Sequence, residues 1–439
     1  MPVWPKSFYT FGLSLKTAAV EWKLRKKRAG PADQERALVA LTPRLAAASY
    51  WRSLGVEKTM AYTRFQSKVP LHSSSRLLPA IERMKSGESD VLWPGRCALF
   101  AVTSGVEEGQ PKFVPMTEEI LAHFRRAGRD ALLYYTVRVR HAGAFRGRHL
   151  LLGGATSLNP VTSAGASAAY AGELSGVVVL NLPAWAEKHL YEPGIGVAKI
   201  PDWDARLDAI AAATSTRDIT LLAATPTCAL LLAQALRRRA GAEGRSIPTL
   251  QNLWPNLECF VHGGLPAVPY AAELRTTLGP AVKLHEVYAA TEGFIASQDC
   301  DAVGAGLRLM TDTGIFFEFL PMAAWDESRL EHLGSKAVPL SGVTTGVDYA
   351  LVLTTPGGLA RYVLGDVVRF TSTAPPRLSY VGRTRLRLHT FGENVSEKEI
   401  TDTLVGVCHR HKWSAVNFHV APLPLAASLT GQNRGRHEW

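Results

Sequence analysis

The sequence lacks the cysteine patterns that build small secreted or zinc-binding proteins. Its five cysteines, from Cys97 to Cys408, are widely separated and form no C-x-x-C pair. A disulfide framework or a structural zinc site needs closely and regularly spaced cysteines. We therefore expect each cysteine to be a small, buried side chain in a reducing compartment.

Long hydrophobic runs are also missing. No run of about 18 apolar residues occurs, which is the length that a membrane-spanning helix requires. Lys16 interrupts the weakly apolar stretch after Phe11, so the N-terminus has no continuous apolar centre of a secretory leader. These absences predict a cytoplasmic protein with no membrane partner.

Acidic residues are the scarcer charged type. The chain has 38 Asp and Glu against 49 Lys and Arg, a formal net charge of +11. This balance favours anionic partners without choosing among nucleic acid, membrane surface and phosphorylated small molecules. The basic cluster at residues 23–28 has neither interleaved aromatic residues nor a nucleic-acid motif, so we interpret it as a solvated helix face. We expect no nucleic-acid partner.

The residues that are present indicate a large α/β protein. The chain has 439 residues, more than one ordinary domain, and 46% of them are hydrophobic. Short apolar segments that end in glycine-containing or polar loops alternate with helical patterns, which predicts α/β layers. The predicted strands of this part are residues 98–102, 150–152, 177–180, 258–261 and 282–287.

Helical periodicity appears in three places. Leu38, Leu41 and Leu45 predict a helix over residues 34–55. Thr117, followed by two glutamates, predicts the N-cap of another helix. In the third helix, residues 228–239, the predicted buried face consists of Cys228, Leu231, Leu232, Ala235 and Leu236.

The pattern changes after Ile315 to short strands and turns. Strands are predicted over residues 349–355, 361–370 and 379–381, and a further helix near Glu397. We expect a large N-terminal domain over residues 1–382 whose β-rich, barrel-like part spans about 310–382. Residues 383–439 would form a partial C-terminal domain.

The segment from Thr103 to Lys112, T-S-G-V-E-E-G-Q-P-K, is the first candidate for chemistry. Glycines allow backbone amides to converge on an anion, hydroxyls add donors, and a lysine adds positive charge. An ordinary surface loop of this composition is common, and the two acidic residues disfavour phosphate. Alone, the segment decides nothing.

Three further segments carry polar groups at the ends of predicted strands. Tyr288 to Gly293, Y-A-A-T-E-G, offers an aromatic ring, a hydroxyl and a carboxylate where open α/β sheets bind ligands. Arg361 to Asp366 places a carboxylate after a glycine bend, and Gly382-Arg383 begins the terminal segment. Each has an ordinary alternative as a strand-to-loop turn.

The order of these four segments resembles that of the adenylate-forming superfamily of acyl-CoA ligases, luciferases and peptide-synthetase adenylation domains. The ten-residue spacing from Thr103 to Lys112, the F-F-E-F-L-P run at residues 316–321 and G-G-L-A-R-Y-V-L-G-D-V-V-R at residues 357–369 are similar to one branch. The chain is identified as a member of the auxin-responsive acyl acid–amido synthetase (Gretchen Hagen) family, in a bacterial-looking version.

The resemblance implies a two-step reaction with ATP and Mg²⁺ as cofactors. A small-molecule carboxylic acid attacks the α-phosphate of ATP to give acyl-AMP, and an amine, typically an amino acid, then displaces AMP. The catalytic residues that it implies are Lys112, Thr291 and Glu292, with Glu292 as the metal ligand. The nucleotide-binding residues that it implies are Thr103, Ser104, Gly105, Gly109, Lys112, Gly263, Gly264, Tyr288, Thr291, Asp366 and Arg383.

Two departures from the family pattern favour a rival hypothesis. Val106, Glu107 and Glu108 replace a threonine and small residues, and a like-charge pair ~5 Å apart costs about 3 kcal/mol. Only about 57 residues follow Gly382, so we expect a chain truncated within the mobile C-terminal domain. The alternatives are a degenerate module that binds nucleotide or acid without turnover, and an acyl-CoA ligase.

Overall fold

A computed structural model describes most of the chain. The described residues are 6–25, 30–107, 110–161, 168–385, 387–388, 395–411, 413, 418, 420–424 and 435–438. The predictions for Glu108 and Gly109, and for the side chains of Ser104, Val106 and Glu107, lie outside this description.

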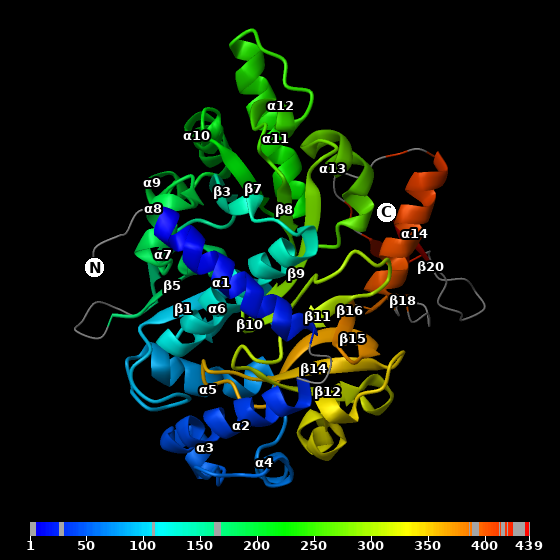
Figure 1. Cartoon of the computed structure of the whole chain (residues 1–439). Helices are drawn as coiled ribbons and strands as arrows, with labels where there is room; N and C mark the ends of the chain where they lie inside the picture. Colours follow the sequence, from blue (N-terminus) through cyan, green and yellow to red (C-terminus); the bar gives the residue numbers. More distant parts are fainter. Residues whose placement is uncertain are drawn as a thin grey trace.

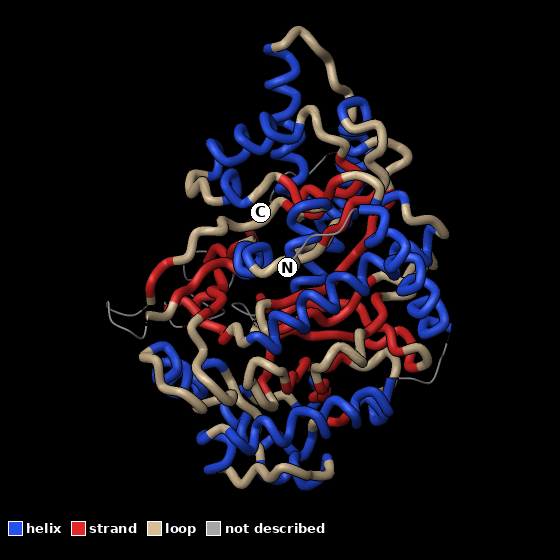
Figure 2. The backbone as a smooth tube through the Cα atoms, turned by 60° about the vertical axis from the view of Figure 1, so that its left-hand side comes forward, coloured by secondary structure: helices blue, strands red, loops and turns tan. Residues whose placement is uncertain are grey.

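One sheet of twelve strands forms the centre of the molecule, and helices lie around it (Figures 1 and 2). Five neighbouring strands are parallel, as expected for an α/β half. In spatial order they are β6 (Tyr191–Glu192), β3 (Arg148–Leu151), β7 (Ile219–Ala223), β8 (Cys259–His262) and β9 (Lys283–Ala290).

The second half of this sheet is antiparallel and continues directly from β9. It contains the strands predicted after Ile315, which are thereby confirmed as elements. In spatial order they are β10 (Gly293–Ser297), β11 (Leu307–Leu309), β16 (Pro376–Arg383), β15 (Tyr362–Thr373), β14 (Asp348–Thr354), β12 (Phe316–Pro321) and β13 (Val338–Pro339). Strand β9 is therefore the seam between the two halves. The domain boundary at residue 382 stays a prediction.

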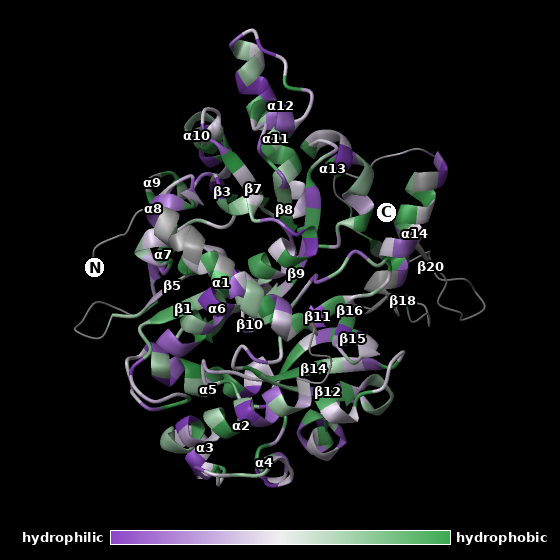
Figure 3. Cartoon of the chain, in the orientation of Figure 1, coloured by the Kyte–Doolittle hydropathy of each residue, from purple (hydrophilic) through white to green (hydrophobic). Residues whose placement is uncertain are grey.

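Helices α10 (Trp203–Thr214), α11 (Pro226–Ala242) and α13 (Ala271–Leu278) pack with the parallel half in one hydrophobic core. Helix α11 buries Leu232 and Leu236 as predicted, but Leu231 is 37% exposed. The buried stripe is instead completed by Ala229, Leu230 and Ala233. The central strands are mostly hydrophobic in Figure 3, as a sheet covered on its faces requires.

A smaller sheet has the order β2–β1–β5–β4. Its strands are β1 (Leu99–Glu107), β2 (Gln110–Pro115), β5 (Tyr170–Glu173) and β4 (Asn159–Pro160). The predicted strand at residues 177–180 is wrong, because this segment belongs to helix α7 (Leu174–Leu180). The sequence of a short apolar run fits a buried strand and a buried helix equally well. In this segment, packing against the neighbouring elements selects the helix.

The N-terminal region is helical. Leu38, Leu41 and Leu45 lie in a helix, as their spacing predicts, and they are buried, but the predicted helix over residues 34–55 divides near Ala48. The helices are α1 (Lys6–Arg25), α2 (Gly30–Ala47), α3 (Ser49–Ser53), α4 (Tyr62–Lys68), α5 (Ser74–Lys85) and α6 (Glu118–Val139). The remaining α-helices and strands of the described residues are α8 (Ala184–His189), α9 (Ile195–Ala198), α12 (Leu250–Leu253), α14 (Glu397–His411), β17 (Arg387–Leu388), β18 (Val395–Ser396), β19 (Ala421–Pro424) and β20 (Gly435–Glu438).

Two expectations drawn from absences can be compared with the fold. In the part of the chain that the structure describes, no helix is both long and apolar enough to cross a membrane. Cys97 and Cys259 are buried as predicted, whereas Cys228, Cys300 and Cys408 are half-buried. The prediction of burial is therefore correct for two cysteines and wrong for three.

Candidate active site

The Thr291-Glu292 pair occupies the tip of a tight hairpin at the seam of the large sheet. Ala290 at the end of β9 pairs with Gly293 at the start of β10, which leaves two residues in the turn. A Cβ added at Gly293 would lie 2.3 Å from Cδ1 of Ile315, a fully buried side chain that would then have to move. This crowding fixes the turn against the body of the protein.

An ion pair joins this turn to the predicted phosphate-binding segment. Lys112, on β2, donates a hydrogen bond to Glu292 Oε1, and the Glu292 side chain is only 4% exposed. Burial opposes a charge on Lys112, but the Glu292 carboxylate outweighs it and raises the pKa of Lys112. Two of the three predicted catalytic residues are thus in contact although 180 positions separate them.

Strand β1 extends further than the sequence predicted. Thr103 lies opposite Lys112 in the β1–β2 ladder, and the register shifts between Thr103 and Val106. The expected loop after Val102 is therefore the end of a hairpin strand with a bulge at Ser104 and Gly105. Pairing with β2 continues β1 past Val102. The glycine at position 105 therefore marks a bulge within the strand and not the end of the strand.

Tyr288 and Asp366 meet across the antiparallel half of the sheet. The Tyr288 hydroxyl donates a hydrogen bond to Asp366 Oδ2 at 2.6 Å, and Arg383 Nε lies 3.4 Å from Asp366 Oδ1. Burial and the neighbouring Asp366 carboxylate raise the pKa of Tyr288 well above its ordinary value. Three residues predicted to bind the nucleotide thus form one cluster on β9, β15 and β16.

The two predicted glycines lie at the carboxyl end of β8, beside β9. An added Cβ at Gly263 would lie 2.4 Å from the carbonyl oxygen of Val287, so this backbone approaches the strand that carries Tyr288. Gly264 has φ +79°, a left-handed conformation that favours glycine. Carboxyl ends of neighbouring strands are where open α/β sheets bind ligands.

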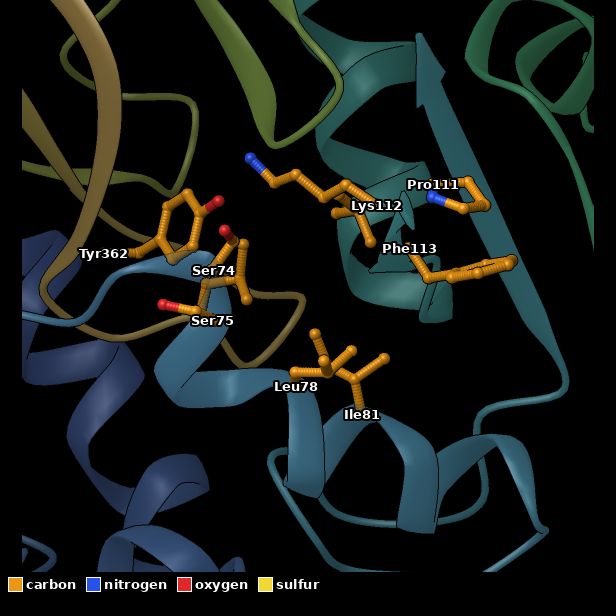
Figure 4. A pocket seen from close by; sticks show the side chains of 10 residues that line it. Ser74, Ser75, Leu78, Ile81, Pro111, Lys112, Phe113 and Tyr362 are labelled. Atoms are coloured by element: carbon orange, nitrogen blue, oxygen red, sulfur yellow. The ribbon is translucent and has the colours of Figure 1, made fainter. Parts of the chain in front are cut away.

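A pocket opens beside Lys112, between α5 and β2 (Figure 4). The Lys112 amine lies 4.8 Å from the centre of the Tyr362 ring. Leu78, Ile81 and Phe113 give the pocket an apolar wall, and the hydroxyls of Ser74 and Tyr362 lie at its polar end with the Lys112 amine. The pocket is lined by Ser74, Ser75, Leu78, Ile81, Pro111, Lys112, Phe113, Val114, Leu359 and Tyr362.

Sequence reasoning missed the serines of this pocket. Ser73 accepts a hydrogen bond from the amide of Arg76 and caps α5, which places Ser74 and Ser75 in the first helical turn. The Ser74 hydroxyl is buried and, among the described residues, has no hydrogen-bond partner. A run of three serines before an apolar helix was the available signal, since serine caps helices and offers donors to anions.

Sequence reasoning also assigned no role to Arg361, which lies next to Tyr362. Its side chain is fully buried and donates hydrogen bonds to both oxygens of Glu318 at 2.8–3.1 Å. It also donates to the backbone carbonyls of Gln66, Val69 and Gly334. Arg361 thus anchors the segment that carries Tyr362.

Two structural comparisons place the fold among known enzymes. The structure described as AtGH3.15 acyl acid amido synthetase in complex with 2,4-DB superposes with a TM-score of 0.76 at 19% identity, covering 100% of this chain and 81% of that one. A 2-hydroxyisobutyryl-CoA ligase in complex with 2-HIB-AMP superposes with a TM-score of 0.53 at 17% identity, covering 85% and 72%. The fold is that of the adenylate-forming enzymes.

Two family models match the sequence. The GH3 family N-terminal domain matches residues 24–283, and the GH3 family central domain matches residues 308–383. The chain belongs to the GH3 family. The identification from sequence motifs is thereby confirmed, while the bacterial character stays a prediction.

Two of the curated relatives come from rice. Indole-3-acetic acid-amido synthetase GH3.8 of Oryza sativa subsp. indica is 26% identical over 430 residues, 84% of this chain and 69% of the relative. Putative indole-3-acetic acid-amido synthetase GH3.10 of Oryza sativa subsp. japonica is 26% identical over 405 residues, 84% and 81% of the two chains. Both are similar to this chain along most of its length.

Proposed function

We propose that this chain is an ATP-dependent ligase that activates a carboxylic acid as acyl-AMP and transfers the acyl group to an amine, with an amino acid as the expected acceptor. The observation that carries the proposal is the contact of Lys112 with Glu292, which lies in the turn between β9 and β10. Strand β9 and the turn after it thus carry an aromatic ring and a carboxylate, and β2 of the smaller sheet brings a cation to that carboxylate. GH3 membership and the names of the relatives support the amide-forming second step.

The residues present fit ATP and a divalent cation. Carboxylate oxygens are ligands that Mg²⁺ accepts, so Glu292 would hold the ion, which neutralises phosphate charge when bound. Lys112 and the Thr291 hydroxyl would hold phosphate oxygens while negative charge develops at phosphorus. The Tyr288 ring would lie against adenine. Asp366 would accept the ribose hydroxyls, since each carboxylate oxygen has two lone pairs and can accept more than one donor.

We assign the outer phosphates of ATP to the polar end of the pocket between α5 and β2. Ser74 and Ser75 lie in the first turn of α5, where backbone amides without helical partners attract anions. The Lys112 amine lies at the same end. The apolar wall of the pocket lowers the local polarity beside these groups, which strengthens their electrostatic contacts.

The acceptor distinguishes this function from that of an acyl-CoA ligase. Both kinds of enzyme share acyl-AMP formation and differ in whether an amine or a thiol displaces AMP. We expect this chain to form an amide when ATP, a carboxylic acid and an amino acid are supplied together. Added coenzyme A should not compete with the amino acid for the acyl group.

The first test is ATP–pyrophosphate exchange with purified protein, Mg²⁺ and a panel of aromatic and aliphatic acids. Acid-dependent exchange that is lost in Glu292→Ala supports adenylation. Glu243→Ala is the matched control, because Glu243 pairs with Arg245 at the protein surface. ATP binding without exchange for any acid would instead support the rival hypothesis of a degenerate binding module.

A further inference from the structure

His123 is a buried histidine whose two ring nitrogens are both engaged. It lies on α6 and is 3% exposed. Its Nε2 accepts a hydrogen bond from the backbone N–H of Phe294 at 2.9 Å. Because Nε2 is an acceptor, Nδ1 carries the proton of the neutral ring and donates to the carbonyl oxygen of Thr313, also at 2.9 Å. Burial lowers the pKa of His123 to about 4, so the ring is neutral at pH 7.

The amide of Phe294 needs this partner because of its place in strand β10. Across from β9, Phe294 is opposite Ala289, one step beyond the Ala290–Gly293 pair that closes the hairpin. Neighbouring pairs of an antiparallel ladder alternate between hydrogen-bonded and non-hydrogen-bonded, so the Phe294 N–H points away from β9. On that side the ladder with β11 pairs Ala296 and Ser297 and stops short of Phe294. The His123 ring completes the pairing that β11 leaves open.

The same helix is also connected to Lys112. Strand β2 carries Lys112 and ends at Pro115, and Thr117 then caps α6 through a hydrogen bond from the Ile120 amide. The Thr117 hydroxyl donates to the carbonyl oxygen of Pro356 at 2.8 Å, which ties this end of the helix to the body of the protein. One partner of the Lys112–Glu292 ion pair is thus joined to α6 by the chain, and the other by His123.

We propose that His123 is a positioning residue for acid activation, which fixes the Thr291–Glu292 turn opposite Lys112 through its hydrogen bond to Phe294. The inference rests on the proposed function, because it assigns the turn a place in the reaction. His123 touches no reacting group. Its effect is to hold the Glu292 carboxylate, two residues before Phe294, where metal and phosphate meet. Small misplacements of such groups cost about a hundredfold in rate.

Two substitutions separate the two bonds of His123. The amide oxygen of His123→Gln reaches the position of Nε2 and can accept from Phe294, but the Thr313 bond is lost. The amide nitrogen of His123→Asn reaches the position of Nδ1 and can donate to Thr313, but the Phe294 bond is lost. Each variant keeps one of two similar hydrogen bonds, so a purely structural role predicts similar losses of stability.

We expect His123→Asn to lower the acid-dependent exchange rate about tenfold to a hundredfold. It should also raise the Mg²⁺ concentration that gives half-maximal exchange, while the KM for the acid stays unchanged. We expect His123→Gln to stay within about threefold of the wild-type rate. Equal activity of wild type and His123→Asn would overturn the proposal, as would equal losses in both variants that parallel their thermal midpoints.

Two further measurements test the positioning role without an activity assay, and the second needs no variant. Hydrogen–deuterium exchange of the peptide that spans residues 288–297 should be faster in His123→Asn than in His123→Gln. Imidazole ¹⁵N spectra of the wild-type protein should show His123 protonated on Nδ1 and not titrating above about pH 5. A wild-type protein without acid-dependent exchange would refute the proposed function alone. Equal deuterium uptake, or a proton on Nε2, would refute the positioning role alone.

Discussion

At the scale of single residues, the site contains two contacting pairs, Lys112 with Glu292 and Tyr288 with Asp366. Lys112, Tyr288, Glu292 and Asp366 were predicted because motif order marks them, and the structure places them in two contacting pairs. Arg361 and His123 were not assigned these roles, because their functions depend on backbone groups far away in sequence. Sequence motifs mark side chains that recur in a family at fixed spacing. Hydrogen bonds from a side chain to a distant backbone group become visible only in the folded structure.

At this scale the ion pair makes a direct prediction. Glu292→Gln keeps the shape of the side chain but removes the charge, so the mostly buried Lys112 amine loses its carboxylate partner. We expect acid-dependent exchange to fall at least a hundredfold, and stability to fall by about 1–3 kcal/mol for the lost charged hydrogen bond. Exchange assays and urea titration measure the two effects. A Glu243→Gln control should change neither, and normal exchange in Glu292→Gln would exclude a metal-holding role.

Elements were predicted where periodicity and capping agreed. The Thr117 cap and the helix that follows it are confirmed, because the cap hydrogen bond is local and encoded within three residues. Residues 177–180 and the end of β1 were predicted incorrectly, because tertiary packing and pairing with β2 decide these segments. Thus the order of layers was readable from sequence, while the hairpin geometry that brings Lys112 to Glu292 required strand pairing.

The β9–β10 hairpin gives a prediction at the scale of the element. Gly293→Ala would place a methyl group 2.3 Å from Ile315 Cδ1 and push the turn out of position. We expect exchange to fall about tenfold or more, with a loss of about 1–3 kcal/mol of stability from overpacking. Adding Ile315→Val removes the obstructing Cδ1 atom, keeps the rest of this fully buried side chain and should restore part of the activity. Failure of the second substitution to restore any activity would show that crowding is not the cause.

Across the whole molecule, Arg361 joins segments that lie far apart in the sequence. Helix α4, strand β12 and the 3₁₀ helix that contains Gly334 all converge on its guanidinium group. This convergence fixes the N-terminal helices to the antiparallel half of the sheet. The sequence predicts the strands over residues 349–355 and 361–370. It does not predict the contacts of the Arg361 side chain, because three of its acceptors are backbone carbonyl groups, which carry no sequence signature.

Removing this anchor should destabilise the entire chain. In Arg361→Met the Glu318 carboxylate stays buried without its cation, and breaking a buried pair costs about 3–5 kcal/mol. Arg369→Met is the control, because its pair with Asp348 is partly exposed and worth about 0–1 kcal/mol. Urea unfolding monitored by circular dichroism measures both. Equal midpoints for the two variants would contradict the role of Arg361.

Four of the five buried histidines in the described residues predict how stability depends on pH. Burial lowers the pKa of His72 and His285 to about 3 and that of His123 and His262 to about 4. The unfolded chain takes up protons as the pH falls through about 6.5, but the folded chain does not until near pH 4. Stability present above pH 6.5 is therefore lost as the pH falls, by up to about 1.4 kcal/mol per pH unit for each histidine.

The thermal midpoint at pH 5.5 should accordingly lie below that at pH 7, with little change between pH 7 and pH 8. His285→Gln removes one titrating group and should reduce this slope. A midpoint that does not fall between pH 7 and pH 5.5 would contradict the assignment of neutral, buried rings.

The contact between Lys112 and Glu292 also affects how readily free ions bind at these two side chains. A free Mg²⁺ ion must displace a tethered ammonium group from the carboxylate, and free orthophosphate must displace a tethered carboxylate from the amine. Either exchange alone leaves one buried charge without a partner, which is costly. A metal–nucleotide complex supplies both replacements at once. Under the proposed function, this ion pair would disfavour the binding of Mg²⁺ or phosphate alone relative to the binding of their complex.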